Sequence, residues 1–171
     1  MLQLLITGRK NYTNFIEQSL STTLMKFLLL SILIIWIIGF LQPLLLTQTN
    51  SLTNYLLAKT YSRVCHQESS KCILIGNESM LVCTRCAGIY FGALITGLLF
   101  VFNRILELKI QILVIASIPL LLDVCLVFLG AYKYSQTIAL ITGLAFGSII
   151  YLFLLLELEN IFVNKSIKRN E

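Results

Sequence analysis

Four of the five cysteines and the only histidine of this 171-residue chain fall between Cys65 and Cys86. Cys83 and Cys86 form a Cys-x-x-Cys pair, a spacing with which two thiolates bind one tetrahedral metal ion. Cys65 and Cys72 can supply the remaining two ligands, and His66 is a fifth candidate. The pattern predicts a Cys₄ or Cys₃His site for zinc, or for iron, in a small zinc-ribbon-like loop.

A thiol redox centre is the alternative for the same residues. A Cys-x-x-Cys pair at the N-terminus of a helix has its thiolates stabilised by the helix dipole and by a neighbouring cation, here Arg85. Cys65 and Cys72 could exchange disulfides with Cys83 and Cys86. Quinone-linked disulfide-generating oxidases have a similar layout of four membrane helices. In a third interpretation the cysteines only staple the loop, so the sequence leaves open whether the protein is an enzyme.

The composition indicates an integral membrane protein. Hydrophobic residues make up 57% of the chain and charged residues 12%, whereas about a quarter of a soluble domain is charged. The formal net charge is +5, but the basic residues are scattered and form no polybasic run with interleaved aromatic residues. We therefore expect the lipid bilayer as a partner and no binding of nucleic acid.

Four apolar segments are predicted to cross the hydrocarbon core, which is roughly 30 Å thick. They occupy residues 27–46, 86–102, 110–129 and 136–156. The connections are short, which is typical of an antiparallel bundle. We predict an all-α integral membrane bundle of four transmembrane helices, with a Cys/His loop, residues 47–85, between the first and the second. Gly76-Asn77 is a turn signal within this loop.

The segments outside the bundle are more polar. Residues 1–26 are expected to form an N-terminal interfacial or cytoplasmic segment, part of which could be a short interfacial helix. Residues 27–156 then form the membrane domain, and residues 157–171 form a charged tail that we expect to fray. Residues 51–63, inside the Cys/His loop, could form a helix on the membrane surface.

The distribution of basic residues predicts the orientation. One side of the bundle holds eight of them, namely Arg9, Lys10, Lys26, Arg104, Lys109, Lys165, Lys168 and Arg169. The other side holds five, namely Lys59, Arg63, Lys71, Arg85 and Lys133. Because the side richer in lysine and arginine stays inside, both termini are expected in the cytoplasm and the Cys/His loop outside.

Asp123 is an acidic residue well inside a predicted span. It lies about 14 residues into the third segment, roughly 10 Å from its outer end. The second segment starts on the same side, so Arg85 and Tyr90 should lie at a similar depth. A carboxylate at that depth should face a partner, and we expect an ion pair with Arg85 and a hydrogen bond from Tyr90. This group would tie two helices together or act as an acid, base or proton relay; Gln67 and Arg85 are expected to orient the metal site.

Two pairs of glycines offer faces for close approach between helices. They are Gly88 with Gly92 and Gly143 with Gly147, each at a spacing of four residues. Such small residues let helix backbones approach within a membrane. The glycine faces predict helix packing within one chain or across a homodimer interface. In either case the protein could also be a subunit of a larger membrane assembly. Three aromatic residues are expected only to pack or to anchor the interface: Trp36, Tyr132 and Tyr134.

The chain resembles a prokaryotic family of uncharacterised membrane proteins, domain-of-unknown-function family 2085, over about residues 61–150. The family signature is Cys-His-Gln, a basic and a small residue, and then Cys-x-Arg-Cys-x-Gly-x-Tyr-x-Gly, with a later Pro-x-x-x-Asp and Thr-Gly-x-x-x-Gly. The matching residues here are Cys65-His66-Gln67, Lys71-Cys72, Cys83 to Gly92, Pro119 to Asp123, and Thr142-Gly143 to Gly147.

The resemblance implies a multi-pass protein of the prokaryotic inner, or cytoplasmic, membrane, and no particular reaction. Some positions depart from the family pattern. Lys71 and Cys72 stand where the family more often has arginine and serine. Val124 and Val127 replace a glycine and a glutamine, and Ala139 replaces a frequent arginine.

Overall fold

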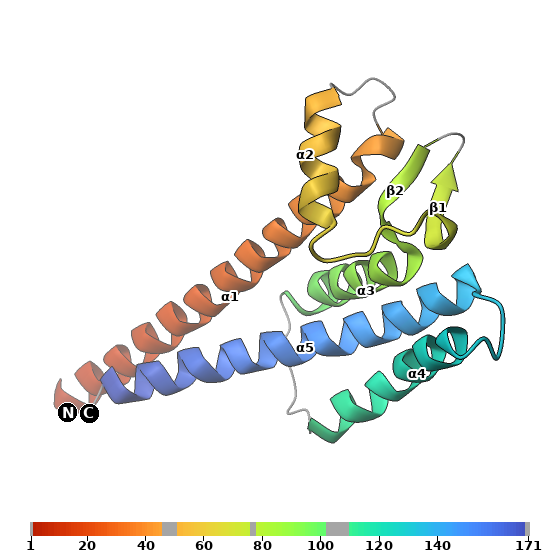
Figure 1. Ribbon diagram of the computed structural model, residues 1–171. Coiled ribbons are helices and arrows are strands. Elements are labelled where there is room, and N and C mark those ends of the chain that lie inside the picture. Colours follow the sequence, from red (N-terminus) through yellow and green to blue (C-terminus); the bar gives the residue numbers. More distant parts are fainter. Residues whose placement is uncertain (1, 46–50, 76–77, 102–109, 170–171) are drawn as a thin grey trace.

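The computed structural model describes residues 2–45, 51–75, 78–101 and 110–169 of the chain. The elements, in chain order, are α1 (Leu2–Leu45), α2 (Ser51–Tyr61), a 3₁₀ turn (Ser69–Lys71), β1 (Cys72–Ile75), β2 (Glu78–Cys83), α3 (Thr84–Phe100), α4 (Ile110–Phe128) and α5 (Gln136–Arg169). The helix α2 and the hairpin gather at one end of the molecule, while the start of α1 and the end of α5 extend to the opposite side (Figure 1). The protein is mainly helical.

Three helical segments are long and apolar enough to cross a membrane. They are Ser21–Leu44, Ile110–Phe128 and Gln136–Ile161. The fourth apolar helix, α3, has 17 residues, which at 1.5 Å per residue extends about 25 Å, less than the roughly 30 Å of a hydrocarbon core. The expectation of several membrane helices is confirmed for three of them.

The first and last helices are longer than the sequence led us to expect. Instead of a separate N-terminal helix, α1 is one continuous helix of 44 residues. The tail that we expected to fray continues α5 as helix to Arg169. Residues 9–38 and 148–169 contain no glycine or proline. Each helix therefore continues through the point where its sequence changes in polarity, because no helix-breaking residue lies there.

A two-stranded hairpin lies within the Cys/His loop, where we expected no strand. The strands β1 and β2 pair in antiparallel fashion, with Cys72 opposite Cys83 and Ile75 opposite Glu78. A bulge between Cys72 and Leu74 interrupts the register. The expected turn at Gly76-Asn77 lies outside the described residues. The helix expected on the membrane surface corresponds to α2.

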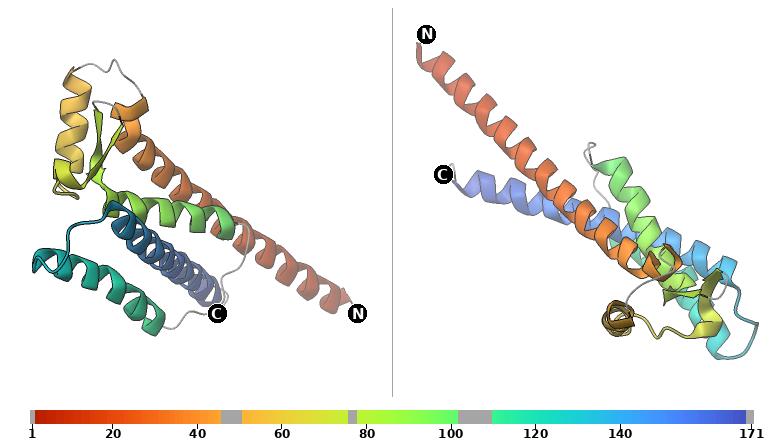
Figure 2. Two further views of the ribbon diagram at one scale, coloured as in Figure 1. Left: turned by 90° about the vertical axis from the view of Figure 1, so that its right-hand side faces the viewer. Right: turned by 90° about the horizontal axis from the view of Figure 1, so that it is seen from above.

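The two glycine pairs face one another across the contact between α3 and α5. A Cβ atom on Gly88 would lie 2.5 Å from the carbonyl oxygen of Leu140, and one on Gly147 would overlap the backbone of Ile89. The Ser148 hydroxyl also donates a hydrogen bond to the carbonyl oxygen of Gly92 at 3.2 Å. The two backbones therefore pack directly against each other, and both helices run away from the hairpin in the same direction (Figure 2). The glycine faces serve packing within one chain.

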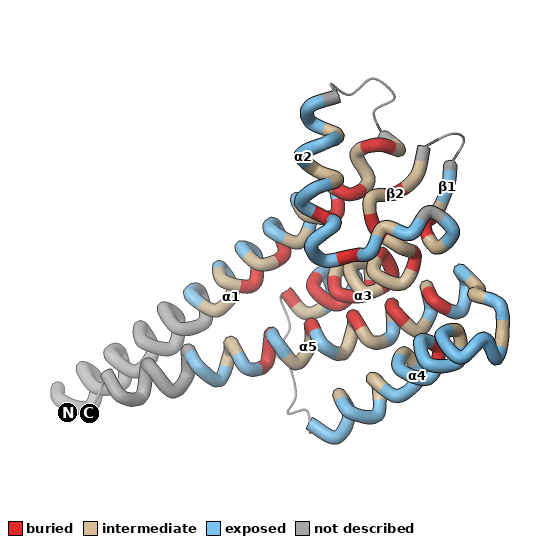
Figure 3. Tube along the Cα trace, in the orientation of Figure 1, coloured by how far each residue is buried: buried red, intermediate tan, exposed pale blue. Residues whose placement is uncertain are grey.

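The helices α1 and α4 flank this pair unequally. Near the hairpin, α1 packs through Phe40, which is fully buried with Tyr61 and Val82. Only Asp123 is buried on α4, whose remaining described surface is largely exposed (Figure 3). Exposed apolar side chains suit a helix whose surroundings are lipid chains. The least covered helix is therefore the one that holds the buried acid.

A second buried charge lies toward the other end. Lys26, which we had expected to face the cytoplasm, is buried and forms an ion pair with Glu159 of α5. Its ammonium group also donates to the carbonyl oxygen of Phe100 at 3.3 Å. This cation lies at the C-terminus of α3, where it offsets the partial negative charge of the last carbonyl groups. Lys26 thus joins α1, α3 and α5.

Candidate metal centre

Three cysteine thiols meet where β2 becomes α3. The Sγ atoms of Cys65, Cys83 and Cys86 all lie within 4.8 Å of one another. Cys83 ends β2 and precedes the first turn of α3, so the three-residue spacing brings Cys86 to the same side of that turn. Cys65 arrives from the turn after α2 and accepts a hydrogen bond from the Cys83 backbone N–H at 3.1 Å. We call Cys65, Cys83 and Cys86 the thiol cluster.

Cys72 and His66 lie outside the thiol cluster. Cys72 is 2% exposed and pairs with Cys83 in the hairpin, where directly opposed Cβ atoms are typically about 4.5–5.5 Å apart. Burial, with the nearby Cys65 and Cys83 thiols, raises the pKa of Cys72 to about 11. The His66 side chain is exposed, although it follows Cys65 directly. The structure thus brings three of the five predicted ligands together and keeps Cys72 beside them.

Gln67 holds the Cys65 segment in place. Its side-chain amide donates to the carbonyl oxygens of Ala58 at 3.1 Å and Leu81 at 2.9 Å. The first lies in α2 and the second in β2, so one amide connects both neighbours of the segment. The backbone of Gln67 has φ of +49°, in the left-handed region that is uncommon for residues other than glycine. The two hydrogen bonds hold the segment in this uncommon conformation.

The electrostatic environment favours a thiolate at Cys83. The adjacent Cys86 thiol is the main cause that lowers the pKa of Cys83 to about 5. The backbone N–H groups of Cys86 and Arg85 and the Cys65 thiol act in the same direction, whereas burial opposes them. A thiolate at this position faces the positive end of α3. The cluster can therefore present a ready soft anionic ligand.

The start of the strand that carries Cys72 is held by groups from α3, from the turn before α5 and from the first residue of α5. The buried Thr84 hydroxyl donates to the carbonyl oxygen of Lys71 at 2.9 Å, and the Tyr134 hydroxyl approaches the same oxygen at 3.4 Å. The Gln136 amide donates to the carbonyl oxygen of Cys72 at 3.2 Å. The two backbone carbonyls next to the thiol cluster are thereby fixed.

The predicted ion pair between Arg85 and Asp123 is present. Arg85 donates to Asp123 through Nε at 3.1 Å and also through Nη2. The expected hydrogen bond from Tyr90 is replaced by one from Tyr132, which donates to the other carboxylate oxygen. Tyr90 is five residues from Arg85, about 140° around the helix, and packs instead against Phe40 at 5.7 Å between ring centroids.

Tyr132 and Tyr134, which were expected only to pack or to anchor the interface, belong to this network. The Tyr134 ring lies beneath two cations, with the Arg85 guanidinium 5.8 Å and the Lys71 ammonium 6.0 Å from the ring centroid. A signal was available, because the short turn that contains both tyrosines must return the chain to the end where the Cys/His loop lies. Thr84 and Gln136 were also missed, although they begin the two helices, α3 and α5, that start at the hairpin end.

The fold and this site define an α-helical membrane protein with several apolar helices and a cysteine cluster at one end. Residues 65–153 match the family model described as predicted membrane protein, domain of unknown function 2085, and the chain belongs to this family. An uncharacterized protein of Methanocaldococcus jannaschii is 31% identical over 136 residues, which cover 74% of this chain and 87% of that protein. No solved structure shows significant similarity to the chain.

Proposed function

We propose that the protein binds a thiophilic metal ion, zinc or iron, at the hairpin end of its membrane domain. The observation that carries this proposal is the mutual approach of three thiols within 4.8 Å. One ion at about 2.3 Å from each sulfur would bring the three sulfurs to a similar separation. Cysteine thiolates are also the ligands that zinc and iron share.

Cys72 is the fourth ligand in this proposal. It stands opposite Cys83 in the hairpin, so a change in its side-chain rotamer can turn the sulfur toward the cluster. The bulge beside Cys72 gives this strand a local irregularity of the kind that often redirects a side chain near a site. His66 is the substitute ligand, because it follows Cys65 but starts from an exposed position.

The surroundings suit a site with excess negative charge. Four thiolates around a divalent ion leave a net charge of −2, and the Arg85 guanidinium follows Cys83 by two residues. Arg85 is itself paired with Asp123, so its effect on the thiolates is shared with that carboxylate. Gln67 and Thr84 fix the backbone on either side of the cluster. Ligands held in this way cost little to organise when the ion binds.

The arrangement in the membrane is also proposed. If the short helix α3 crosses the bilayer together with the three longer apolar helices, the chain crosses four times and both termini lie on one side. The start of α1 and the end of α5 extend to the same side of the molecule, which supports an even number of crossings (Figure 1). The basic-residue count supports an orientation with both termini in the cytoplasm, in the prokaryotic inner membrane that the family resemblance implies. A structural or binding role, alone or as a subunit of a membrane assembly, fits this site better than any particular reaction.

Metal analysis and thiol counting on one sample test the proposal. Protein purified in mild detergent without chelator should contain about one zinc or iron per chain, as a four-ligand site requires. Cys83→Ser should remove most of the metal. Cys125→Ser is the matched control, because Cys125 is exposed on α4, and it should keep the metal. Less than a tenth of an equivalent in the parent protein, with all thiols reactive, would refute the proposal.

The lowered pKa of Cys83, beside the Cys86 thiol, supports a second candidate function, a membrane thiol–disulfide oxidoreductase. Cys83 and Cys86 would form one S–S bond and release two electrons and two protons, which reduce a quinone to a quinol. Exchange with Cys65 and Cys72 would pass the disulfide on. A Cys83–Cys86 disulfide in protein that lacks metal, reduced by added quinol, would favour this function over metal binding.

A further inference from the structure

The helix α2 has one face packed against the rest of the protein. Tyr61 is 3% exposed, and its hydroxyl donates to the carbonyl oxygen of Trp36 at 2.7 Å. Gly39 leaves room for that hydroxyl, since a Cβ atom there would overlap it. Both Trp36 and Gly39 belong to the candidate span Ser21–Leu44. The C-terminal end of α2 is therefore anchored beside a candidate membrane-spanning helix.

The opposite face of α2 is apolar and exposed. Leu52, Tyr55 and Leu56 are 70%, 62% and 54% exposed, and their spacing of three and four residues places them on one side of the helix. Exposed Ile35 and Ile38 of α1 flank the residues that Tyr61 contacts. Exposed aliphatic side chains thus lie both on this face of α2 and on the part of α1 beside which α2 packs.

The direction of α2 differs from that of the spanning helices. In Figure 1 it runs across the line of α5, and from above in Figure 2 it is seen nearly end-on while α1, α3 and α5 extend across the view. A helix that lies crosswise to the spans runs along the membrane plane, and an exposed apolar face on such a helix sits at the boundary of headgroups and acyl chains.

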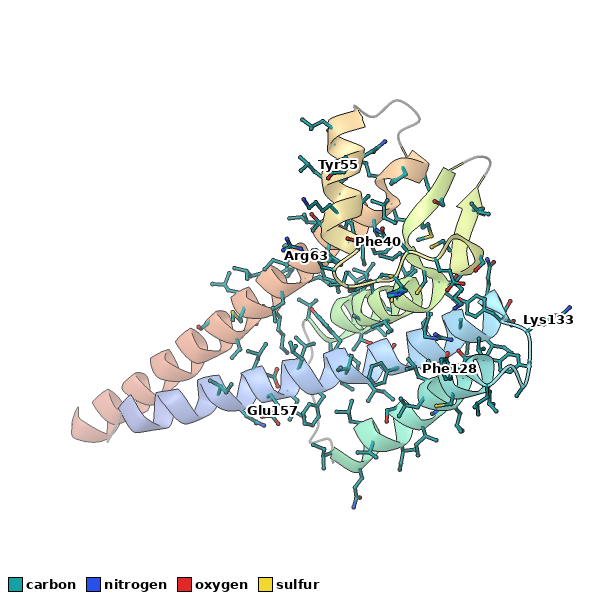
Figure 4. All side chains as sticks on the ribbon, viewed as in Figure 1. Phe40, Tyr55, Arg63, Phe128, Lys133 and Glu157 are labelled. Atoms are coloured by element: carbon teal, nitrogen blue, oxygen red, sulfur yellow. The ribbon has the colours of Figure 1, made fainter. Side chains whose placement is uncertain are left out.

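Two cations continue the exposed side of α2. Lys59 lies one turn after Tyr55, with its ammonium group 5.9 Å from the centroid of that ring. Arg63 lies one turn further, where hydrogen bonds from Ser62 to Ala58 and from Arg63 to Thr60 extend the helical path (Figure 4). Both side chains are exposed, and among the described residues neither forms an ion pair with a carboxylate. Long basic side chains of this kind extend toward headgroups while their stems cover apolar surface.

We propose that α2 is an interfacial helix that binds an anionic phospholipid on the hairpin side of the membrane. The acyl chains lie along Leu52, Tyr55 and Leu56, and the headgroup phosphate lies between Lys59 and Arg63. Two cations one helical turn apart suit a phosphate group, for which arginine also offers a fork of N–H donors. This inference does not depend on metal at the thiol cluster, which α2 only adjoins.

Lipid binding by the full chain tests the proposal. The purified protein in neutral detergent is titrated with phosphatidylglycerol, phosphatidylcholine or inorganic phosphate, and bound lipid is counted by native mass spectrometry beside the thermal midpoint. Phosphatidylglycerol should bind and raise the midpoint, and the other two should not. Each cation near an anionic surface raises the binding affinity roughly fivefold. The double variant Lys59→Gln/Arg63→Gln should therefore bind phosphatidylglycerol roughly 30-fold more weakly.

Two further variants separate the parts of the site. Lys133→Gln removes an exposed cation from the turn between α4 and α5, away from α2 (Figure 4), and should keep full phosphatidylglycerol binding. Leu52→Ser/Leu56→Ser keeps both cations and should also weaken binding. Unchanged affinity in the Lys59/Arg63 double variant would overturn the proposal. An equal response to phosphatidylcholine would overturn the headgroup assignment, and an equal response to inorganic phosphate would replace the lipid by a free anion. The readout is the lipid-dependent change, so a variant of lower intrinsic stability remains informative.

Discussion

Arg85 and Asp123 form a buried ion pair that joins the first turn of α3, next to the thiol cluster, to the C-terminal half of α4. Asp123 is the only residue buried on α4, so the helix that is least covered by protein is held at its one buried position by charge. Tyr132 binds the other carboxylate oxygen. The position of α4 is therefore linked through Arg85 to the segment that carries Cys83 and Cys86.

The first prediction concerns this ion pair. Asp123→Asn and Arg85→Gln should each lower the free energy of unfolding in detergent by about 2 kcal/mol or more, because each leaves a buried charge without its partner. The double variant should recover part of the loss, with a coupling on the order of 1 kcal/mol or more. Thermal unfolding of the four proteins measures the cycle. Strictly additive single effects would show that the pair contributes nothing beyond its separate members.

Tyr132→Phe provides the matched control for that cycle. It removes only the hydroxyl that donates to Asp123 and keeps the ring. We expect a loss of about 1–2 kcal/mol, the cost of leaving one buried acceptor unpaired. In the Asp123→Asn background the same substitution should cost less, since the charge that strengthens the hydrogen bond is already absent. Equal losses in both backgrounds would place the effect of Tyr132 elsewhere.

The second prediction concerns the direct contact between α3 and α5. Gly92→Ala and Gly147→Ala should each destabilise the protein by about 1–3 kcal/mol, because the added methyl groups meet backbone atoms that cannot move independently. Ala145→Val adds bulk to an exposed position of the same helix, α5, and should change stability by no more than about 0.5 kcal/mol. Thermal midpoints in one detergent measure all three. Tolerance at both glycines would mean that the helices are farther apart in the membrane.

The contacts that the sequence predicted rest on local patterns with a simple physical consequence. The glycine spacing predicts a closely packed neighbouring helix. The depth of Asp123 predicts a cation from another helix as its partner. The donor to the second oxygen of Asp123 was predicted wrongly as Tyr90. The correct donor, Tyr132, depends on how the turn before α5 folds back, and no periodicity in the sequence records that path.

The hairpin beside the thiol cluster could not be predicted from sequence periodicity. Four-residue and six-residue strands are too short to be distinguished from other apolar stretches by periodicity, so the pairing of Cys72 with Cys83 was not foreseen. Cysteine spacing indicated which thiols could share one ion, and the structure brings three of them together. The metal itself stays a prediction. The continuous helices α1 and α5 were missed because polarity changes along them while helix propensity does not.

The third prediction concerns the orientation in the membrane. Lys133 is exposed in the turn between α4 and α5, at the hairpin end. In a background without the native cysteines, Lys133→Cys should react with a membrane-impermeant maleimide in intact cells. A cysteine added after Glu171 should react only once the cells are permeabilised, since the basic-residue count predicts that the termini lie inside. The reverse pattern would invert the orientation and place the thiol cluster in the reducing cytoplasm, which would weigh against the disulfide oxidoreductase.

The fourth prediction separates the two features of Gln67, its amide and its left-handed backbone. Gln67→Ala removes the hydrogen bonds to Ala58 and Leu81 and keeps a Cβ atom at φ of +49°. Gln67→Gly removes the same hydrogen bonds and relieves the backbone strain. The glycine variant should therefore be more stable than the alanine variant by about 0.5–1 kcal/mol, although both are less stable than the parent protein.

Metal affinity should follow the amide and not the backbone. Because Gln67 fixes the segment that carries Cys65, both variants should bind zinc about 10–100-fold more weakly than the parent, as is typical when a group that orients a ligand is removed. Competition with a chromogenic zinc chelator measures this affinity in detergent. If Gln67→Gly keeps the parent affinity while Gln67→Ala loses it, backbone geometry rather than the amide positions Cys65. If both variants bind zinc as tightly as the parent, Gln67 serves the stability of the fold and not the thiol cluster.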